Sequence, residues 1–471
     1  MIKTRFAVLG LGVLAATAAL PLDAAAGPKS AKAAHGPDLA GDWFDRPQID
    51  AGGLSMGLHF RRNGGVLTGT VDVPQMGGVG APLANIKADN LQLSFDVAGV
   101  SAHYSGTWDP AQKGYVGTFT SPGGNGPFTF VRGTLPPPKP VDWSAPMAPG
   151  FAYAPAAAAP ARVGPTLPVG KCVNLSDTLE APVEGAWGAV FKDDDFAIIK
   201  AAGFRTVRIP VRWSAHAAES APYSIDPAFI ARVHHVVGLA TAIGLNVILN
   251  VHHYEALDAA PEANISRFSA LWRQIAASFA NAPSNVWFEL DNEPHDKFTN
   301  ANLMAVFRPA LAAIRETNKT RPVVIGGEGW SGISSLATLP MPDDPYVVPT
   351  FHYYEPFAFT HQGATWVGPH PPPIGRAYGS AADKAGLEQD LQKVRDYMAR
   401  TGRVPLLGEY GAQDDPRVPL EQRIRYYRTI SAAFASAGVQ SCAWGYRAGF
   451  KLREGDHWLS GLVEAISTTK P

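Results

Sequence analysis

Residues 286–294 read Val-Trp-Phe-Glu-Leu-Asp-Asn-Glu-Pro, a short, mainly apolar run that ends in an amide and a carboxylate. A second run, residues 404–410, reads Val-Pro-Leu-Leu-Gly-Glu-Tyr and also carries a glutamate at its end. Short apolar runs of this kind are typical of strands that are buried on both faces of a parallel sheet. If both runs belong to one barrel, Glu293 and Glu409 emerge at the same rim and face one cleft. Two carboxylates across a cleft are the minimum equipment for cleaving a glycosidic bond.

Eight such runs follow a change of sequence texture at about Val169, and amphipathic stretches separate most of them. The runs are residues 171–175, 206–210, 246–251, 285–290, 322–326, 347–351, 404–408 and 439–443. Acidic or proline starts and glycine stops mark two of the intervening helices, at residues 193–203 and 226–244. This alternation predicts an α/β fold, a (β/α)8 TIM barrel over residues 169–471, with its active site at the C-terminal ends of the strands.

Residues 37–134 differ, because they are rich in glycine and alternate apolar with polar residues. Alternation broken by turns such as Asn63-Gly64-Gly65 predicts seven or eight short antiparallel strands. We expect a small all-β accessory domain, a barrel or a sandwich. Its aromatic residues form either the core or a glycan-binding face; these are Trp43, Tyr104, Trp108 and Tyr115. Proline and alanine dominate residues 135–168, which predicts a stiff, extended linker.

The N-terminus has the pattern of a secretory signal peptide, residues 1–26. Lys3 and Arg5 precede an apolar stretch at residues 6–20, and three alanines at residues 24–26 provide a cleavage site. The apolar stretch is too short for a permanent anchor, and no later segment is long enough to span a bilayer. We therefore expect a secreted or periplasmic protein whose mature chain starts near Gly27.

The chain has only two cysteines, Cys172 and Cys442, in the first and last predicted barrel strands. These strands become neighbours when the barrel closes, so an oxidising compartment permits a bond between them. Bridges between adjacent parallel strands are geometrically awkward, which favours two buried free thiols.

Length and charge narrow the classes of function. A chain of 471 residues favours two folded units. The formal net charge is −1, so nothing draws the protein electrostatically to nucleic acid or to a membrane. Eleven Trp and fourteen Tyr offer faces for sugar rings, although most such residues in any protein lie in the core. We expect a monomer whose partner is a β-linked polysaccharide.

Six of the eight predicted strands end in polar or aromatic residues, which packing alone does not explain. These residues are Arg208, His252, His253, Asn292, Glu293, His352, Tyr354, Glu409 and Trp444. The array resembles glycoside hydrolase family 5, retaining β-glycanases on a (β/α)8 barrel that include many cellulases. The matching motifs are residues 207–213, 251–253, 292–294, 352–354, 408–410 and 443–444. Asp291 departs from the apolar residue expected before Asn292.

The resemblance implies a role for each carboxylate. Glu293 would be the acid/base, which donates a proton to the leaving oxygen and later takes one from water; this role needs a raised pKa. Glu409 would be the nucleophile, which stays ionised and forms a covalent glycosyl-enzyme. Arg208 would hold Glu409 charged through a short charge-assisted hydrogen bond.

The remaining residues would bind or orient. Tyr354 would donate to Glu409, Asn292 would bind the sugar 2-hydroxyl, and Trp444 would form a platform under the ring at the cleavage point. His252 and His352 would orient hydroxyls and the two carboxylates. His253 follows His252 on the strand, so the two side chains point to opposite faces. We expect His252 to point toward the barrel axis and His253 to lie in the turn.

Three alternatives remain beside a secreted, retaining endo-β-1,4-glucanase that needs no metal or cofactor. A metal-dependent barrel hydrolase usually carries His-x-His on a strand, whereas here the histidines are adjacent. A non-catalytic carbohydrate-binding barrel would not need both carboxylates together with Arg208 and Asn292. A β-mannanase, xyloglucanase or transglycosylase with the same mechanism fits as well, because specificity depends on the shape of the loops.

Overall fold

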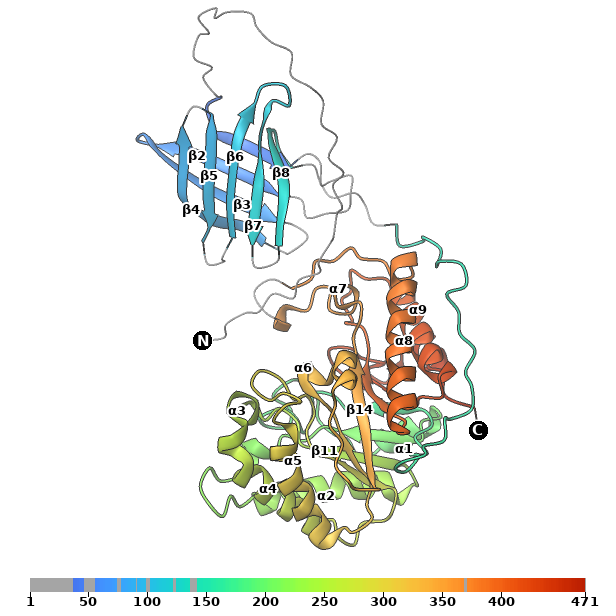
Figure 1. Ribbon diagram of the computed structural model, residues 1–471. Coiled ribbons are helices and arrows are strands. Elements are labelled where there is room, and N and C mark those ends of the chain that lie inside the picture. Colours follow the sequence, from blue (N-terminus) through green and yellow to red (C-terminus); the bar gives the residue numbers. More distant parts are fainter. Residues whose placement is uncertain are drawn as a thin grey trace, which may run out of the picture. The chain divides into compact units, whose positions relative to one another are not determined.

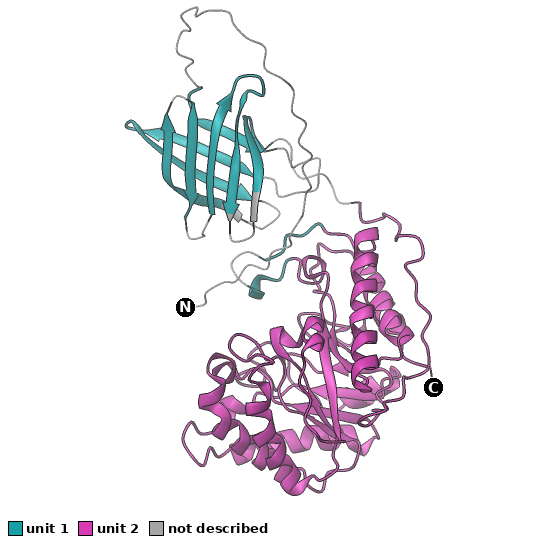
Figure 2. Cartoon of the chain, in the orientation of Figure 1, with its two compact units in different colours: residues 1–140, 363–375 teal, residues 141–362, 376–471 magenta. Residues whose placement is uncertain are grey.

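The computed structural model describes residues 37–45, 56–73, 78–89, 91–98, 102–121, 124–135, 142–367 and 371–470. The chain divides into two compact units, residues 1–140 with 363–375 and residues 141–362 with 376–471 (Figure 2). The predicted signal peptide lies outside the described residues. Within the described ranges, no helix combines the length and apolarity that crossing a bilayer requires.

The first unit contains a closed antiparallel barrel in which each strand pairs with the next and the last returns to the first (Figure 1). Its strands are β1 (Gly41–Asp45), β2 (Gly57–Asn63), β3 (Val66–Val73), β4 (Gly78–Asp89), β5 (Gln92–Val97), β6 (Ala102–Asp109), β7 (Gly114–Ser121) and β8 (Gly124–Arg132). Alternate residues of β5 (Leu93, Phe95 and Val97) are buried, as the period-two pattern predicts. The prediction of a small all-β domain is confirmed, and the barrel is the correct alternative.

Aromatic side chains fill this barrel. Trp43, Tyr104 and Tyr115 are buried, and the ring of Trp43 lies 5.5 Å from Tyr115 and 6.3 Å from Trp108. The Tyr104 hydroxyl donates to the Tyr115 carbonyl at 2.8 Å. Buried rings cannot form a binding face, so the core alternative is correct for Trp43, Tyr104 and Tyr115, and the partly buried Trp108 packs against them.

The second unit contains the predicted TIM barrel, a closed parallel sheet in which the last strand pairs with the first. Its strands are β9 (Cys172–Asn174), β10 (Thr206–Ile209), β11 (Asn246–Asn250), β12 (Val286–Glu289), β13 (Val323–Ile325), β14 (Val347–Tyr353), β15 (Leu406–Tyr410) and β16 (Ser441–Ala443). Each strand falls on one of the eight predicted apolar runs, apart from shifts of one or two residues at the ends. The fold prediction for this part of the chain is confirmed.

Helices surround the parallel barrel, and the two helices that the sequence predicts, at residues 193–203 and 226–244, are among them. They are α1 (Asp195–Ala201), α2 (Pro227–Ala242), α3 (Glu255–Ala259), α4 (Pro261–Ser278), α5 (Leu303–Thr317), α6 (Glu328–Ser331), α7 (Phe357–Thr360), α8 (Ala381–Thr401), α9 (Leu420–Ser436) and α10 (Leu462–Ala465). Asp226 caps α2 by accepting from the Ala228 amide at 2.8 Å, with Pro227 as the first helical residue. A capping box at Ser380 and Asp383 begins α8, and a left-handed Gly402 ends it.

Residues 142–170 contain no strand or helix and lie against the helices of the second unit. Phe151 is buried in the large apolar core, and the Tyr153 hydroxyl donates to Glu388 of α8 at 2.8 Å. The Ala156 amide donates to the Ala435 carbonyl of α9 at 3.0 Å. Near the C-terminus, β17 (Arg453–Glu454) and β18 (His457–Trp458) form a two-stranded sheet.

Strand alternation decides which side chains enter the barrel. In β12, Val286 and Phe288 belong to the core between sheet and helices, whereas Trp287 packs with inward residues of other strands. Glu289 comes two residues after Trp287, so it also points into the barrel, at the level above Trp287. In the same way, alternate residues of other strands point inward, and Arg208 of β10 and Glu409 of β15 meet Glu289 below the rim.

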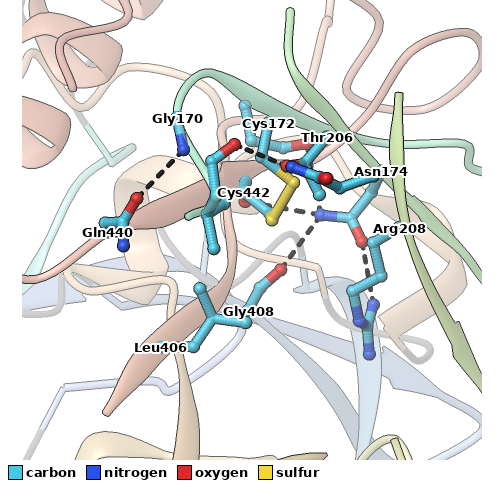
Figure 3. The surroundings of a disulfide bond; sticks show 12 residues. Gly170, Cys172, Asn174, Thr206, Arg208, Leu406, Gly408, Gln440 and Cys442 are labelled. Atoms are coloured by element: carbon cyan, nitrogen blue, oxygen red, sulfur yellow. Dashed lines mark hydrogen bonds between the residues drawn. A yellow bond between two sulfur atoms is a disulfide. The ribbon is translucent and has the colours of Figure 1, made fainter. Parts of the chain in front are cut away.

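The two cysteines form a disulfide, which corrects the expectation of free thiols (Figure 3). Cys172 and Cys442 stand directly opposite each other in the pairing of β9 with β16. Their Cα atoms are 4.4 Å apart, at the near limit of the usual range for disulfides. Direct registration, which the sequence does not reveal, makes the bridge possible between parallel strands.

Replacing Cys172 and Cys442 by serine is expected to lower the free energy of unfolding by about 2–5 kcal/mol. The disulfide closes a loop with a sequence separation of 270 residues, so its loss frees a large part of the unfolded chain. Urea unfolding followed by tryptophan fluorescence gives the change in midpoint. An unchanged midpoint under oxidising conditions would contradict this expectation.

Candidate active site

Glu293 and Glu409 meet at the C-terminal rim of the parallel barrel. Glu409 lies within β15, and Glu293 follows the end of β12 by four residues. A carboxylate oxygen of each and a ring nitrogen of His352 lie within 4.8 Å of one another. The two carboxylates therefore lie closer together than the roughly 6.5–9.5 Å that leaves room for a water molecule, as they do in retaining sites. The arrangement therefore suits direct attack by one carboxylate.

Arg208 of β10 lies beneath the carboxylates and is completely buried. A guanidinium has five N–H donors, and here each has an acceptor. Nε and Nη2 donate to the two oxygens of Glu289 at 2.6 and 2.9 Å. Nη2 also donates to Asn292 Oδ1 at 2.6 Å. Nη1 donates to Asn174 Oδ1 at 2.8 Å and to Glu409 Oε1 at 2.6 Å. The predicted hydrogen bond to Glu409 is thus present as one of five that fix the guanidinium.

Glu289 is a residue that sequence reasoning missed. It is fully buried and binds Arg208 through both oxygens, so the buried cation faces two carboxylates. A buried charge without a partner is costly, so a glutamate inside an apolar strand is itself a signal of a buried cation. Glu289 also lies two residues after Trp287, whose side chain points into the barrel, and this spacing predicts that the Glu289 carboxylate points inward as well.

Tyr354 and His352 contact the two catalytic candidates from β14 and its end. The Tyr354 hydroxyl donates to Glu409 Oε2 at 2.8 Å, as expected. His352 Nδ1 lies 2.7 Å from Glu293 Oε1 and 3.6 Å from Glu409 Oε2, so this ring spans both carboxylates. Burial lowers the pKa of His352 to about 4, which keeps the imidazole neutral near neutral pH.

The surroundings divide the carboxylates into a proton donor and an anion. Burial raises the pKa of Glu293 to about 7; the charges of Arg208 and His295 oppose the rise, and Glu289 adds to it. Burial also raises the pKa of Glu409 and the charge of Glu293 adds to the rise, but the charge of Arg208 and the hydrogen bond from Tyr354 oppose it. Because Arg208 and Tyr354 donate directly to Glu409, we place the ionised state on Glu409 and the proton on Glu293.

The other predicted residues line the same rim but differ in their contacts. Asn292 Oδ1 is taken by Arg208, which leaves its amide N–H groups to donate to a sugar hydroxyl. His252 is buried; its Nδ1 accepts from Asn250 Nδ2 at 3.0 Å and its ring stacks on Trp444 at 5.8 Å, but neither described carboxylate bonds to it. Its expected contact with the carboxylates is therefore absent, because Asn250 holds the ring beside Trp444.

His253 lies in the turn after β11, with a positive φ of 52°. Its ring meets the ring of His252 at 4.4 Å and that of Trp187 at 5.5 Å, both edge to face. Burial lowers the pKa of His253 to about 4. Both histidines follow the end of β11 and their rings meet, so the expectation that they point to opposite faces of a strand is wrong, whereas the placement of His253 in the turn is confirmed.

Asp291, the residue that departs from the expected pattern, is buried next to the site. Burial, with the charges of Asp258, Glu289 and Glu293, raises the pKa of Asp291 well above its usual value. Asp258 accepts from the His295 amide at 3.2 Å, so it links the loop after β11 to the loop after β12. A protonated Asp291 carries no charge into this acidic neighbourhood, which explains how an aspartate is tolerated there.

Glu293, His352 and Glu409 have ligand atoms close enough to approach one metal ion. Both oxygens of Glu409, however, already accept hydrogen bonds, from Arg208 at 2.6 Å and Tyr354 at 2.8 Å. The positive charge of Arg208 beside this set also disfavours a cation. The chemistry of the donors therefore fits an acid and nucleophile pair better than a metal site.

Comparisons with known proteins point to one family. The sequence profile of cellulase, glycosyl hydrolase family 5, matches residues 172–449. Endoglucanase H of Acetivibrio thermocellus is 36% identical over 276 residues, which are 59% of this chain and 29% of that protein. A xyloglucan-specific endo-β-1,4-glucanase of Bacteroides ovatus is 28% identical over 51% of this chain and 54% of that protein. The chain thus spans about a third to a half of the length of these two relatives.

Solved structures match the same region. Thermotoga maritima Cel5A in complex with cellobiose is 37% identical, with a TM-score of 0.62 over 64% of this chain and 97% of that chain. The same enzyme in complex with mannotriose is 37% identical, with a TM-score of 0.61 and the same coverage.

Proposed function

Because the chain belongs to glycosyl hydrolase family 5, we propose that it is a retaining endo-β-1,4-glucanase that cleaves β-glucan polysaccharide by double displacement. The observation that carries the proposal is the pair Glu293 and Glu409, with carboxylate oxygens within 4.8 Å of each other and with Arg208 and Tyr354 both donating to Glu409. The disulfide supports export to an oxidising compartment, secreted or periplasmic, where such bonds persist.

In the first step, the Glu409 carboxylate attacks the anomeric carbon while Glu293 donates its proton to the departing glycosidic oxygen. One C–O bond forms and one breaks, which leaves a covalent glycosyl-enzyme. Arg208 and Tyr354 hold Glu409 ionised and oriented for attack. Asn292 donates to the 2-hydroxyl, a contact that strengthens as the oxocarbenium character develops.

In the second step, Glu293 is ionised and removes a proton from a water molecule, which attacks the anomeric carbon from the vacated side. Glu409 leaves as a carboxylate and Glu293 regains its proton, so the enzyme returns to its initial state. His352 stays within 2.7 Å of Glu293 and orients the carboxyl group in both steps. The product keeps the β configuration because two inversions occur.

Two exposed aromatic rings lie near the site and offer faces to sugar rings. Trp330 is 55% exposed and stacks at 5.1 Å on His295, whose ring nitrogen lies 2.7 Å from the Glu293 carbonyl oxygen. Trp187 is 40% exposed and meets His253 beyond His252 and Trp444. Exposed rings near the site suit an extended glycan whose sugars pack beyond the cleavage point.

Release of reducing sugar from soluble β-1,4-glucan, mixed-linkage glucan, xyloglucan and mannan tests the proposal. We expect cleavage of β-1,4-glucan with a rapid fall in viscosity, as internal cuts produce. Cleavage of mannan or xyloglucan alone would support the mechanism but change the substrate. Mannan is tested because a related enzyme binds mannotriose, and xyloglucan because another relative is specific for it. Cleavage of none of the four would contradict the proposed function.

The dependence of kcat/KM on pH is expected to be bell-shaped. Glu293 must be protonated in the first step, and its pKa of about 7 predicts a basic limb near pH 7, above which the rate falls about tenfold per pH unit. Glu409 must be ionised, so the rate also falls toward acid. A profile without a basic limb between about pH 6 and 8 would contradict the assignment of Glu293 as the acid.

A further inference from the structure

The closing seam of the parallel barrel lies beside the Arg208 network. In this seam β16 pairs with β9, Cys442 stands opposite Cys172, and the disulfide joins them. Figure 3 shows this disulfide, Asn174 and Arg208 in one cluster, with a hydrogen bond from Arg208 to Asn174. The seam is thus the place where the two ends of the barrel chain and the buried cation come together.

Asn174 connects the seam to the cation. It is fully buried at the end of β9, two residues after Cys172, so both side chains lie on the same face of the strand. Its Nδ2 donates to carbonyl oxygens of β15 and β16: those of Gly408 at 3.0 Å, Cys442 at 3.3 Å and Ala443 at 3.2 Å. Because these acceptors take the nitrogen, the amide can turn only its oxygen toward Arg208.

The amide oxygen completes the donor pattern of Arg208. Arg208 Nη1 carries two hydrogens: one reaches Asn174 Oδ1 at 2.8 Å and the other Glu409 Oε1 at 2.6 Å. If Asn174 Oδ1 is removed, the first hydrogen has no partner in a buried site, and leaving a charged donor unsatisfied costs more than an ordinary hydrogen bond contributes. The guanidinium then turns to find another acceptor, and its bond to Glu409 changes.

We infer that Asn174 is a positioning residue, which aims Arg208 at Glu409, and that the Cys172–Cys442 disulfide fixes the strand seam that holds Asn174. The inference rests on the proposed role of Glu409 and adds to it two elements that act without touching substrate. The disulfide then helps to keep Glu409 ionised, in addition to stabilising the fold.

The ionisation of Glu409 reports on this arrangement. The charged and titratable groups that face Glu409 are Arg208 from β10, His352 of β14, Tyr354 beyond β14, Glu293 beyond β12 and, through Arg208, Glu289 of β12. Replacing Asn174 leaves all of these groups in place but removes an acceptor of Arg208, so the aim of Arg208 changes. A poorly aimed cation stabilises the carboxylate less, so the pKa of Glu409 rises and the acidic limb of kcat/KM moves to higher pH.

The test is an NMR titration of the full chain labelled with 13C at the glutamate side-chain carboxyl carbon, with the Glu409 signal assigned from Glu409→Gln. In Asn174→Ala we expect the pKa of Glu409 to rise by roughly 0.5–1 unit, the equivalent of one hydrogen bond. The acidic limb of kcat/KM should shift by the same amount while KM changes little. If Asn174→Ala does not fold, Asn174→Ser, which also lacks the amide, carries the same test.

Asn318→Ala is the matched control. Asn318 is also buried and donates to a backbone carbonyl, that of Ala276, at 2.7 Å, but it lies at the end of α5 and contacts none of the site residues. Its replacement should lower the urea midpoint and leave the pKa of Glu409 unchanged. Comparing the two variants distinguishes a change in the ionisation of Glu409 from a general loss of stability.

A double-mutant cycle tests the part of the disulfide. Cys172→Ser with Cys442→Ser should raise the pKa of Glu409 in the wild-type background and have no further effect in Asn174→Ala, because the seam acts through Asn174. An unchanged pKa in Asn174→Ala would overturn the inference, and equal shifts in both backgrounds would overturn the part played by the disulfide. The titration needs no turnover, so a wild type that cleaves no β-glycan would refute the proposed function separately.

Discussion

Replacing Glu409 by glycine is expected to lower kcat on every β-glycan substrate by on the order of 10⁴–10⁶-fold, as the loss of a catalytic nucleophile does. Arg208 keeps its two bonds to Glu289 in this variant, so the buried cation stays paired and the fold should persist. The measurement is the initial rate on a soluble β-1,4-glucan. Urea unfolding of the same preparation shows whether the variant is folded.

Azide gives this variant a diagnostic product. The small anion enters the space that the Glu409 carboxylate leaves and attacks the anomeric carbon from that side, so a β-aryl cellobioside yields the α-glycosyl azide. Glu316→Gln is the matched control, because Glu316 lies on α5, is half exposed and pairs only with Arg273. Its activity should equal that of the wild type. A β-glycosyl azide from Glu409→Gly would contradict the role of Glu409 as nucleophile.

Replacing Glu293 by glutamine is expected to lower kcat on polysaccharide by about 10²–10⁴-fold, the usual contribution of a general acid. A dinitrophenyl glycoside needs no proton on its leaving group, so formation of the glycosyl-enzyme from this substrate should be nearly as fast as in the wild type. Only the second step, which needs the base, slows. A burst of dinitrophenol followed by slow turnover is therefore the expected time course.

The basic limb of the pH profile should also vanish in Glu293→Gln, because the group with a pKa of about 7 is gone. Azide should restore turnover and form the β-glycosyl azide, since it attacks the glycosyl-enzyme from the side opposite Glu409. Equal losses in kcat/KM, which reports formation of the glycosyl-enzyme, on polysaccharide and on the dinitrophenyl glycoside would show that Glu293 is not the acid.

The sequence predicts the barrel and the members of its rim because these depend on simple physical patterns. A strand buried on both faces must be apolar along its length, and such runs stand out against amphipathic helices. The C-terminal ends of parallel strands share one edge, so Arg208, Glu293 and Glu409 converge although the sequence separates Arg208 from Glu409 by 201 residues. Strand direction alone therefore predicts that these three residues meet.

The contacts that depend on register and side-chain direction are those that the sequence did not predict. Whether Cys172 stands opposite Cys442 is set by the shear of the closed barrel, which composition does not reveal. Glu289 was missed because it sits inside an apolar strand, where only the parity with Trp287 shows that it points inward. His252 turns toward Trp444 because Asn250 holds its ring, a contact between residues two apart that periodicity does not specify.

The measurement that tests the central claim most directly is the anomeric configuration of the first product. Proton NMR of cellotetraose or a soluble β-1,4-glucan, recorded in the first minutes after adding enzyme, resolves the α and β anomers before they interconvert. Double displacement by Glu409 and Glu293 predicts that the β anomer appears first and the α anomer grows in only by mutarotation. If the α anomer appears first, the reaction is a single displacement by water and the proposed roles of the two glutamates are wrong.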